Sequence, residues 1–178
     1  MRNVILYIAM SLDGYIADEN GDVGWLTGDG SDIDADGGSF PRFIETIDTV
    51  ILGYRTYHQI VTELCPDSWA YPGKKSYVLT HRSLKSTEEI IFTDEAPEKL
   101  IERLKQEDGK DIWICGGAAV INCLYDFGLF DRICISVIPT VLGGGVRLFD
   151  KHDKPLTLKL ISTEINNGMV DLLYEARD

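Results

Sequence analysis

Ile112-Trp113-Ile114-Cys115-Gly116-Gly117-Ala118-Ala119-Val120-Ile121 is the stretch around which this sequence is organised. An apolar, β-branched run stops at a double glycine. Apolar residues then recur at about the 3.6-residue spacing of a helix as far as Phe127. Gly128 follows as a typical helix C-cap. The stretch therefore predicts a buried strand, a tight turn and a helix in direct succession.

The double glycine is a candidate anion site. A helix that starts directly after a strand presents unpaired backbone N–H groups beyond the strand end, and glycine lets an anionic group approach them closely. A purely steric need for glycine in a tight turn explains the pair equally well, and both interpretations stay open. The longer G-x-G-x-x-G pattern is absent, which argues against a Rossmann site.

Composition narrows the class of protein. With 178 residues and 44% apolar residues, we expect one globular domain spanning 1–178. The net charge of −12 disfavours nucleic acid and anionic membranes as partners. The four cysteines form no C-x-x-C pair, and His81 has no second ligand at useful spacing, so we expect no metal. The absence of a signal peptide or long apolar run predicts a cytoplasmic protein.

Local patterns predict an α/β fold. Helices are expected from Ser39 as N-cap, after Gly53, from Pro97 and after Gly117. The expected strands span 4–10, 49–52, 76–79, 90–92, 112–115, 132–139, 156–165 and 169–176. Asn167-Gly168 is a strong hairpin signal between the last two. We therefore expect a mostly parallel central sheet flanked by helices, with a C-terminal antiparallel β-hairpin.

The segment from Asp18 to Gly38 is predicted to be a long loop that acts as a flexible lid, with Trp25 as an apolar anchor. Calcium ligation by the loop's aspartates is an alternative, which the lack of an EF-hand's glycine and closing glutamate disfavours. The aspartates concerned are Asp29, Asp32, Asp34 and Asp36. Before this loop, Asp13-Gly14 predicts a sharp bend at the end of the first strand.

Two further strand ends carry anion-binding residue types. Gly53-Tyr54-Arg55-Thr56 repeats the strand, glycine and helix-start pattern, and Thr80-His81-Arg82 offers a hydroxyl, an imidazole and a guanidinium. An exposed polar turn is the alternative for the second. Gly143-Gly144-Gly145 is either a plain loop or a place where a substrate phosphate lies against backbone. Ligands of such sheets bind beyond the carboxyl ends of the strands, where we expect residues 53–56, 80–82 and 116–120 to converge.

Together these motifs resemble the dihydrofolate reductase fold. The similarity is greatest to the reductase domain of riboflavin biosynthesis and its stand-alone bacterial relatives. The motifs are Ser11-Leu12-Asp13-Gly14-Tyr15-Ile16-Ala17, Val50-Ile51-Leu52-Gly53-Tyr54-Arg55-Thr56-Tyr57, Thr80-His81-Arg82, Ile114-Cys115-Gly116-Gly117 and Pro139 to Phe149. They follow the family's order over nearly the whole chain.

The resemblance implies NADPH as cofactor. It places Ala9 and Ile16 at the nicotinamide, and the remaining cofactor residues at the phosphates. Those are Gly53, Arg55, Thr56, Thr80, His81, Arg82, Gly116, Gly117, Ala118, Ala119 and Val120. Arg55 and Arg82 favour NADPH over NADH, because a guanidinium pairs bidentately with phosphate.

On the substrate side, the resemblance implies hydride transfer to a C=N or C=O carbon of a small heterocycle, such as a ribosylamino-pyrimidine phosphate. The expected substrate residues are Trp25, Phe43, Gly143, Gly144 and Arg147. Dihydrofolate reductases carry a carboxylate on their first helix, where this chain has Phe43, so dihydrofolate is disfavoured. The zinc-binding motifs of the deaminase usually fused to the riboflavin enzyme are absent from this sequence.

Asp13 is the candidate proton donor, although a structural role in its turn is favoured about two to one by the turn preference of Asp. Two alternatives to the reductase remain. One is a module that binds NADP without chemistry, and the other is a dihydrofolate reductase with a relocated acid. The resemblance also implies a homodimer.

Overall fold

A computed structural model describes residues 1–32 and 38–177. Its helical elements are α1 (Phe40–Thr46), α2 (Tyr54–Gln59), the π-helical turn η1 (Ile60–Leu64), α3 (Pro97–Leu104) and α4 (Ala118–Asp126). Its strands are β1 (Val4–Ser11), β2 (Tyr15–Ala17), β3 (Ile47–Gly53), β4 (Lys75–Leu79), β5 (Ile90–Thr93), β6 (Asp111–Gly116), β7 (Arg132–Ile138), β8 (Val146–Arg147), β9 (Leu158–Asn166) and β10 (Met169–Ala176).

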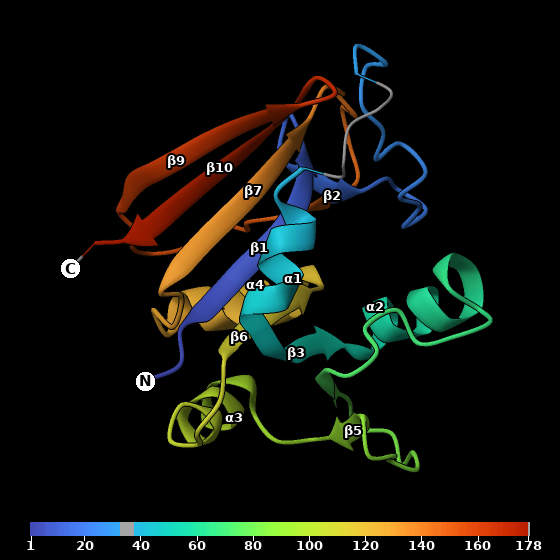
Figure 1. The fold of residues 1–178 in the computed structure, drawn as a ribbon, viewed down its shortest axis with the longest axis vertical. Helices are drawn as coiled ribbons and strands as arrows, with labels where there is room; N and C mark the ends of the chain where they lie inside the picture. The colour runs from blue at the N-terminus through green and yellow to red at the C-terminus, as the bar shows by residue number, and fades with distance from the viewer. Residues whose placement is uncertain (33–37, 178) are drawn as a thin grey trace.

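Eight strands form one sheet in the order β5-β4-β3-β6-β1-β7-β10-β9. The first six are mutually parallel, and β10 and β9 close the sheet as an antiparallel pair (Figure 1). Asn167 and Gly168 form the hairpin turn with φ angles of 47° and 74°, as Asn-Gly predicts. The predicted sheet, its helices and its terminal hairpin are thus confirmed.

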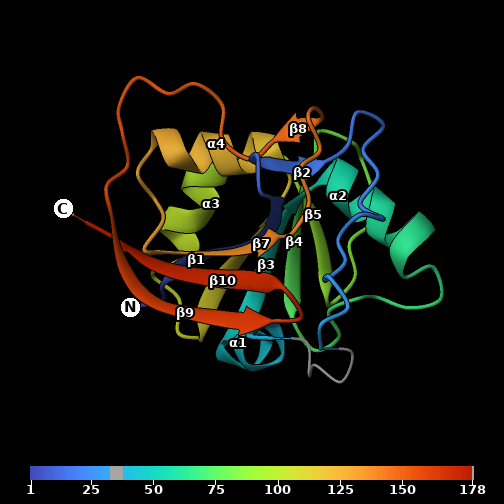
Figure 2. The same ribbon diagram turned by 90° about the horizontal axis from the view of Figure 1, so that it is seen from above.

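Helices cover both faces of this sheet. Figure 2 shows α3 and α4 on one face and α1 on the other. Leu6 and Ile114 belong to the apolar cluster beneath α3 and α4, whereas Tyr7 and Trp113 belong to the cluster on the α1 side. This alternation along β1 and β6 is the period-2 pattern of strands that are buried on both faces.

The chain bends sharply where β1 ends, as predicted. Gly14 has φ +94° and donates its N–H to the carbonyl of Ser11 at 3.0 Å. The bend leads into β2, which pairs antiparallel with the two-residue strand β8. The sequence did not predict this second, two-stranded sheet, because its strands are too short for an alternating pattern to show.

Ser39 stands at the predicted start of α1, but the predicted capping hydrogen bond from its side chain does not form. Ser39 is the N-cap residue, and its hydroxyl donates instead to Asp171 on β10, at 2.6 Å. Asp34 and Asp36, considered above as calcium ligands, lie outside the described residues. Within the described part of the chain, no helix has the length and apolarity needed to span a membrane.

Candidate functional site

Three chain reversals meet at one edge of the sheet. β4, β3 and β6 are parallel neighbours, so their carboxyl ends lie side by side. In register, Gly53 is paired with Leu79 and Leu52 with Gly116. The segments 53–56, 80–82 and 116–120 therefore begin next to one another, as the sequence predicts.

The turn between β6 and α4 requires glycine and leaves its backbone open. Gly116 has φ +130°, a conformation that side chains rarely adopt, and the peptide bond to Gly117 is cis. Gly117 is the N-cap of α4, and no side chain caps this helix. The first N–H groups of α4 therefore point out of the sheet edge without a capping side chain, as an anion site needs.

The turn after β3 lies against this glycine turn. A Cβ on Gly117 would lie 3.1 Å from Oγ1 of Thr56, and a Cβ on Gly53 would lie 3.4 Å from Cγ2 of Val120. Gly53 has φ −75°, so its backbone would accept any residue. Glycine at position 53 therefore keeps the narrow gap between the two turns free of a side chain.

Two guanidinium groups stand at the start of α2. The guanidinium carbon of Arg82 lies 4.6 Å from the centroid of the Tyr54 ring, and the Arg82 N–H donates to Oγ1 of Thr80 at 3.1 Å. Arg55 is exposed on α2, and His81 is exposed beside Arg82. These contacts bring residues 80–82 close to the turns at Gly53 and Gly116. The role of residues 80–82 in holding a phosphate stays a prediction.

A cavity of about 530 Å³ opens between α1 and the carboxyl-terminal halves of the strands, and we call it the Ala9 cavity. Its lining is rich in aromatic rings. Tyr71 and Phe40 both pack edge-on against Trp113, with ring centroids 4.8 and 5.5 Å away. It is lined by Tyr7, Ile8, Ala9, Leu26, Gly38, Phe40, Tyr71, Trp113, Cys115, Ser136, Ile138, Asn166, Met169 and Asp171. Such a space suits a flat, largely apolar ring system.

The residues expected to bind substrate lie elsewhere. None of Trp25, Phe43, Gly143, Gly144 and Arg147 is among the described residues that line the Ala9 cavity. Phe43 stacks on Tyr7 at 4.5 Å on the far side of that ring, and Arg147 lies over Tyr15 at 5.0 Å in the small sheet. Ile16 packs against the core beneath α3 and α4, whereas Ala9 lines the cavity; their places beside the nicotinamide stay predictions.

The triple glycine does hold an anion, but that anion is Asp13. The carboxylate of Asp13 accepts the N–H of Gly143 at 2.7 Å and that of Leu142 at 3.0 Å, and the hydroxyl of Ser11 at 2.7 Å. The Ser11 hydroxyl is the largest of the causes that lower the pKa of Asp13 to about 2. A carboxylate held in this way carries no proton near neutral pH, so the geometry favours the turn role over proton donation.

The loop before α1 is anchored at the hairpin. Asn167 accepts N–H groups from three loop residues: Asp29 donates to its carbonyl at 3.0 Å, and Gly30 and Asp32 donate to its Oδ1 at 3.0 and 3.3 Å. These contacts place Leu26, rather than Trp25, in the wall of the cavity. The described part of the predicted lid thus connects the cavity to the tip of β9 and β10.

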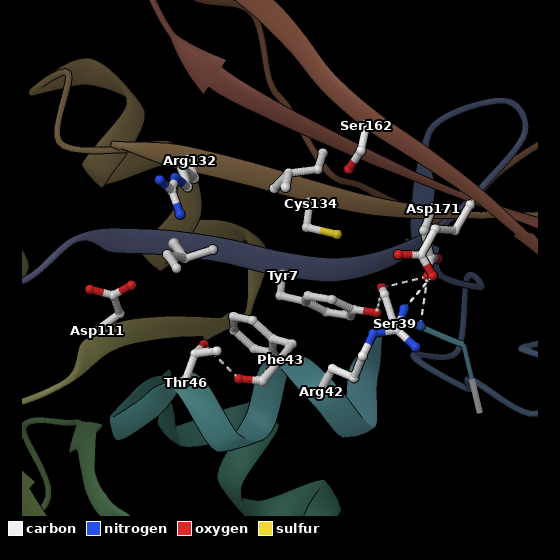
Figure 3. A pocket seen from close by; sticks show the side chains of 13 residues that line it. Tyr7, Ser39, Arg42, Phe43, Thr46, Asp111, Arg132, Cys134, Ser162 and Asp171 are labelled. Carbon is white, nitrogen blue, oxygen red and sulfur yellow. Dashed lines mark hydrogen bonds and ion pairs between the residues drawn. The ribbon is translucent and has the colours of Figure 1, made fainter. Parts of the chain in front are cut away.

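The sequence interpretation missed a carboxylate on β10. Asp171 is 9% exposed and lines both the Ala9 cavity and a neighbouring cavity of about 260 Å³, the Arg42 cavity, shown in Figure 3. Ser39 and Ser136 donate their hydroxyl groups to it, and Tyr7 bonds to Ser39 at 2.8 Å. The one available signal was an acid at the third position of the apolar run Met169–Ala176.

Comparisons with known proteins identify the family of this chain and its fold. A family model, the RibD C-terminal domain, matches residues 2–170. The uncharacterized protein YwjB of Bacillus subtilis is 39% identical over 176 residues, which cover 97% of each chain. A putative riboflavin biosynthesis protein from Shewanella sp. PV-4 is 26% identical, with a TM-score of 0.85 and full coverage of both chains.

The fold also matches a more distant structure. A dihydrofolate reductase from Enterococcus faecalis, solved with NADP(H), is 17% identical with a TM-score of 0.70, covering 99% of this chain and 97% of that one. At this identity the match concerns the fold alone, and it confirms the dihydrofolate reductase-like architecture predicted above. The family model and the curated relative together settle the family: this chain belongs to the RibD C-terminal domain family.

Proposed function

We propose that this chain is an NADPH-dependent reductase of a small heterocyclic substrate. Membership of the RibD C-terminal domain family supports a reductase in general. The observation that carries the proposal is the meeting of three turns at the carboxyl ends of β3, β4 and β6, next to a ring-sized cavity that contains Ala9. One edge of the sheet thus offers an anion site and an aromatic pocket together.

The residues present fit a dinucleotide phosphate. The uncapped start of α4 at Gly117 and the gap kept free of a side chain at Gly53 suit a pyrophosphate close to backbone N–H groups. Arg82, held over Tyr54, and Arg55 suit a 2′-phosphate, with Thr80 and His81 beside them. Ala118, Ala119 and Val120 would complete the turn, as the resemblance implies. NADPH bound here would supply a hydride at the nicotinamide, beside Ala9.

The Ala9 cavity is the proposed substrate site. Its aromatic lining would position a flat ring and exclude water, which favours transfer to a C=N or C=O carbon. A ribosylamino-pyrimidine phosphate, 5-amino-6-(5-phosphoribosylamino)uracil, is the first substrate to try, because the similar Shewanella protein is described as a riboflavin biosynthesis protein. The proton that follows the hydride would come from solvent or from a group of this cavity, whose described lining does not include Asp13.

We further propose a cytoplasmic homodimer formed through β9. This strand is an edge of the large sheet, and Leu160, Ile161 and Ile165 are exposed on it. Long apolar edges are normally covered by a partner. Light scattering coupled to size exclusion checks this part of the proposal, since a mass of one 19.9 kDa chain would refute it.

Titration and turnover test the proposal in two steps. Titration with NADPH, NADP⁺ and NADH followed by intrinsic fluorescence should show binding, with NADPH tighter than NADH. Loss of absorbance at about 340 nm should then appear with the ribosylamino-pyrimidine phosphate or another heterocycle, dihydrofolate included as a comparison. Failure of NADPH to bind would refute the proposal. Binding without turnover of any compound in the panel would favour the non-catalytic NADP-binding module instead.

A further inference from the structure

The Ala9 cavity contains one carboxylate among its described lining residues, that of Asp171. Its other ionisable groups are neutral near pH 7. Burial raises the pKa of Cys115 to about 11, and burial also raises the pKa of Tyr71 and of Tyr7. A ligand in this cavity therefore meets a mostly apolar wall with an acid at a single place.

Hydrogen bonds from uncharged donors hold the Asp171 carboxylate in a fixed orientation. Oδ2 accepts the Ser39 hydroxyl at 2.6 Å and the Ser39 N–H at 3.2 Å, and Oδ1 accepts the Ser136 hydroxyl. Because the Ser39 hydroxyl gives its hydrogen to Asp171, Tyr7 must donate to Ser39. A carboxylate accepts up to about four hydrogen bonds, and these donors account for three of them.

The sheet register places this acid in line with the proposed nicotinamide position. Ala9 is paired with Ser136 on β7, and Ser136 is paired with Asp171 on β10. Residues paired in register point to the same face, so all three lie in one row across the floor of the cavity. Two strand spacings separate Ala9 from Asp171, about 10 Å. A ring that offers its reacting carbon at Ala9 has its opposite edge near Asp171.

We propose that Asp171 determines substrate specificity by accepting a hydrogen bond from an N–H or amino group on the substrate edge that faces away from the nicotinamide. The substrate class is then a heterocycle with a donor edge, as in amino-substituted pyrimidines. A ring that presents only carbonyl oxygens at this edge would face the carboxylate with like partial charges, and it would bind weakly. This inference rests on the proposed function, because that function places the nicotinamide at Ala9.

Two small rings provide the test: 2,4-diaminopyrimidine, which offers amino donors, and 1,3-dimethyluracil, which keeps its carbonyl oxygens and has no N–H. Calorimetric titration of the NADPH complex should show 2,4-diaminopyrimidine binding at least about 10-fold tighter than 1,3-dimethyluracil, the ratio expected for a hydrogen bond to a charged group. Asp171→Asn should reduce this preference, because it removes the charge and replaces one acceptor oxygen by an N–H donor that suits a carbonyl. Glu164→Gln is the matched control, since Glu164 lines the Arg42 cavity but not the Ala9 cavity, and its preference should equal that of the wild type.

The outcomes separate this inference from the function on which it rests. An unchanged preference in Asp171→Asn, or no preference in the wild type, overturns the role of Asp171 while NADPH binding stands. Absence of NADPH binding in the wild type overturns the proposed function instead. If Asp171→Asn does not fold, the inference can be tested on the wild-type protein with 2,4-bis(dimethylamino)pyrimidine, which carries no N–H. This compound should bind at least about 10-fold more weakly than 2,4-diaminopyrimidine. Equal binding of the two overturns the inference.

Discussion

Replacing Arg82 by Gln should separate NADPH from NADH. The guanidinium is exposed and held over the Tyr54 ring at 4.6 Å, in the turn that follows β4. Hydrogen bonds to charged groups contribute about 1.5–3 kcal/mol, and the exposure of Arg82 to solvent excludes the top of that range. A loss of about 1.5–2.5 kcal/mol corresponds to NADPH binding about 10- to 70-fold more weakly. NADH lacks the 2′-phosphate, so its affinity should change by no more than about 2-fold.

Fluorescence titrations with NADPH and NADH measure this difference in affinity. Two control variants show whether the effect is specific to Arg82. Lys151→Gln removes the same unit of charge from an exposed position in the loop between β8 and β9, and it should leave both affinities unchanged. Tyr54→Phe keeps the ring under the guanidinium and should also be silent. Raising the salt concentration should narrow the NADPH preference of the wild type, because ion pairs at the surface are screened. Equal losses for NADPH and NADH in Arg82→Gln would show that Arg82 does not contact the 2′-phosphate.

Three other substitutions test the site and its framework. Gly53→Ala should fold normally, because its Cβ makes only ordinary contacts and φ is −75°. NADPH should nevertheless bind at least about 10-fold more weakly, because the added methyl group fills the proposed phosphate space. An unchanged affinity for NADPH would contradict this prediction. Arg2→Met should lower the free energy of unfolding by about 2–3 kcal/mol in urea titrations, less than for a fully buried pair because its partner Asp48 is 40% exposed. The pKa of Asp13 is lowered from 3.8 to about 2, so its carboxylate stabilises the fold fully above about pH 4 and progressively less toward pH 2. The difference in free energy of unfolding between wild type and Asp13→Asn should therefore shrink as the pH falls from about 4 to about 2. A constant difference would refute the structural role of the Asp13 carboxylate.

The sequence predicted those features that depend on neighbouring residues. Apolar runs, glycine turns and Asn167-Gly168 each act over a few positions, so the strands, the turns at Gly53 and Gly116 and the terminal hairpin could all be read from local pattern. Convergence of the turns also followed, because parallel strands place their carboxyl ends at one edge. The short strands β2 and β8 escaped notice, since two or three residues form no pattern.

The contacts around the expected substrate residues depend on strand register, so local pattern could not give them, and their role in binding substrate stays a prediction. Gly143 was interpreted either as part of a plain loop or as a place for a substrate phosphate, and its N–H donates to the carboxylate of Asp13, 130 positions away. Ser39 was correctly placed at the start of α1, but its hydroxyl bonds to Asp171, 132 positions away. In both cases the sequence identified a polar group at a turn, and the fold decided which distant carboxylate it contacts.

The two acids show how position in the fold outweighs position in a motif. Asp13 stands in a recognisable motif, so sequence reasoning named it as the candidate proton donor while favouring a structural role in its turn. Its hydrogen bonds to Ser11, Leu142 and Gly143 join the end of β1 to the glycine loop, as that structural role requires. Asp171 belongs to no motif and sits in a strand that the sequence assigned only to the hairpin. Pairing of β10 with β7 nonetheless aligns it, through Ser136, with Ala9. A buried carboxylate is unfavourable unless its donors satisfy it, and three donors converge here beside a ring-sized cavity. The chemistry available to a substrate therefore depends on the pairing of β10, which no local pattern specifies.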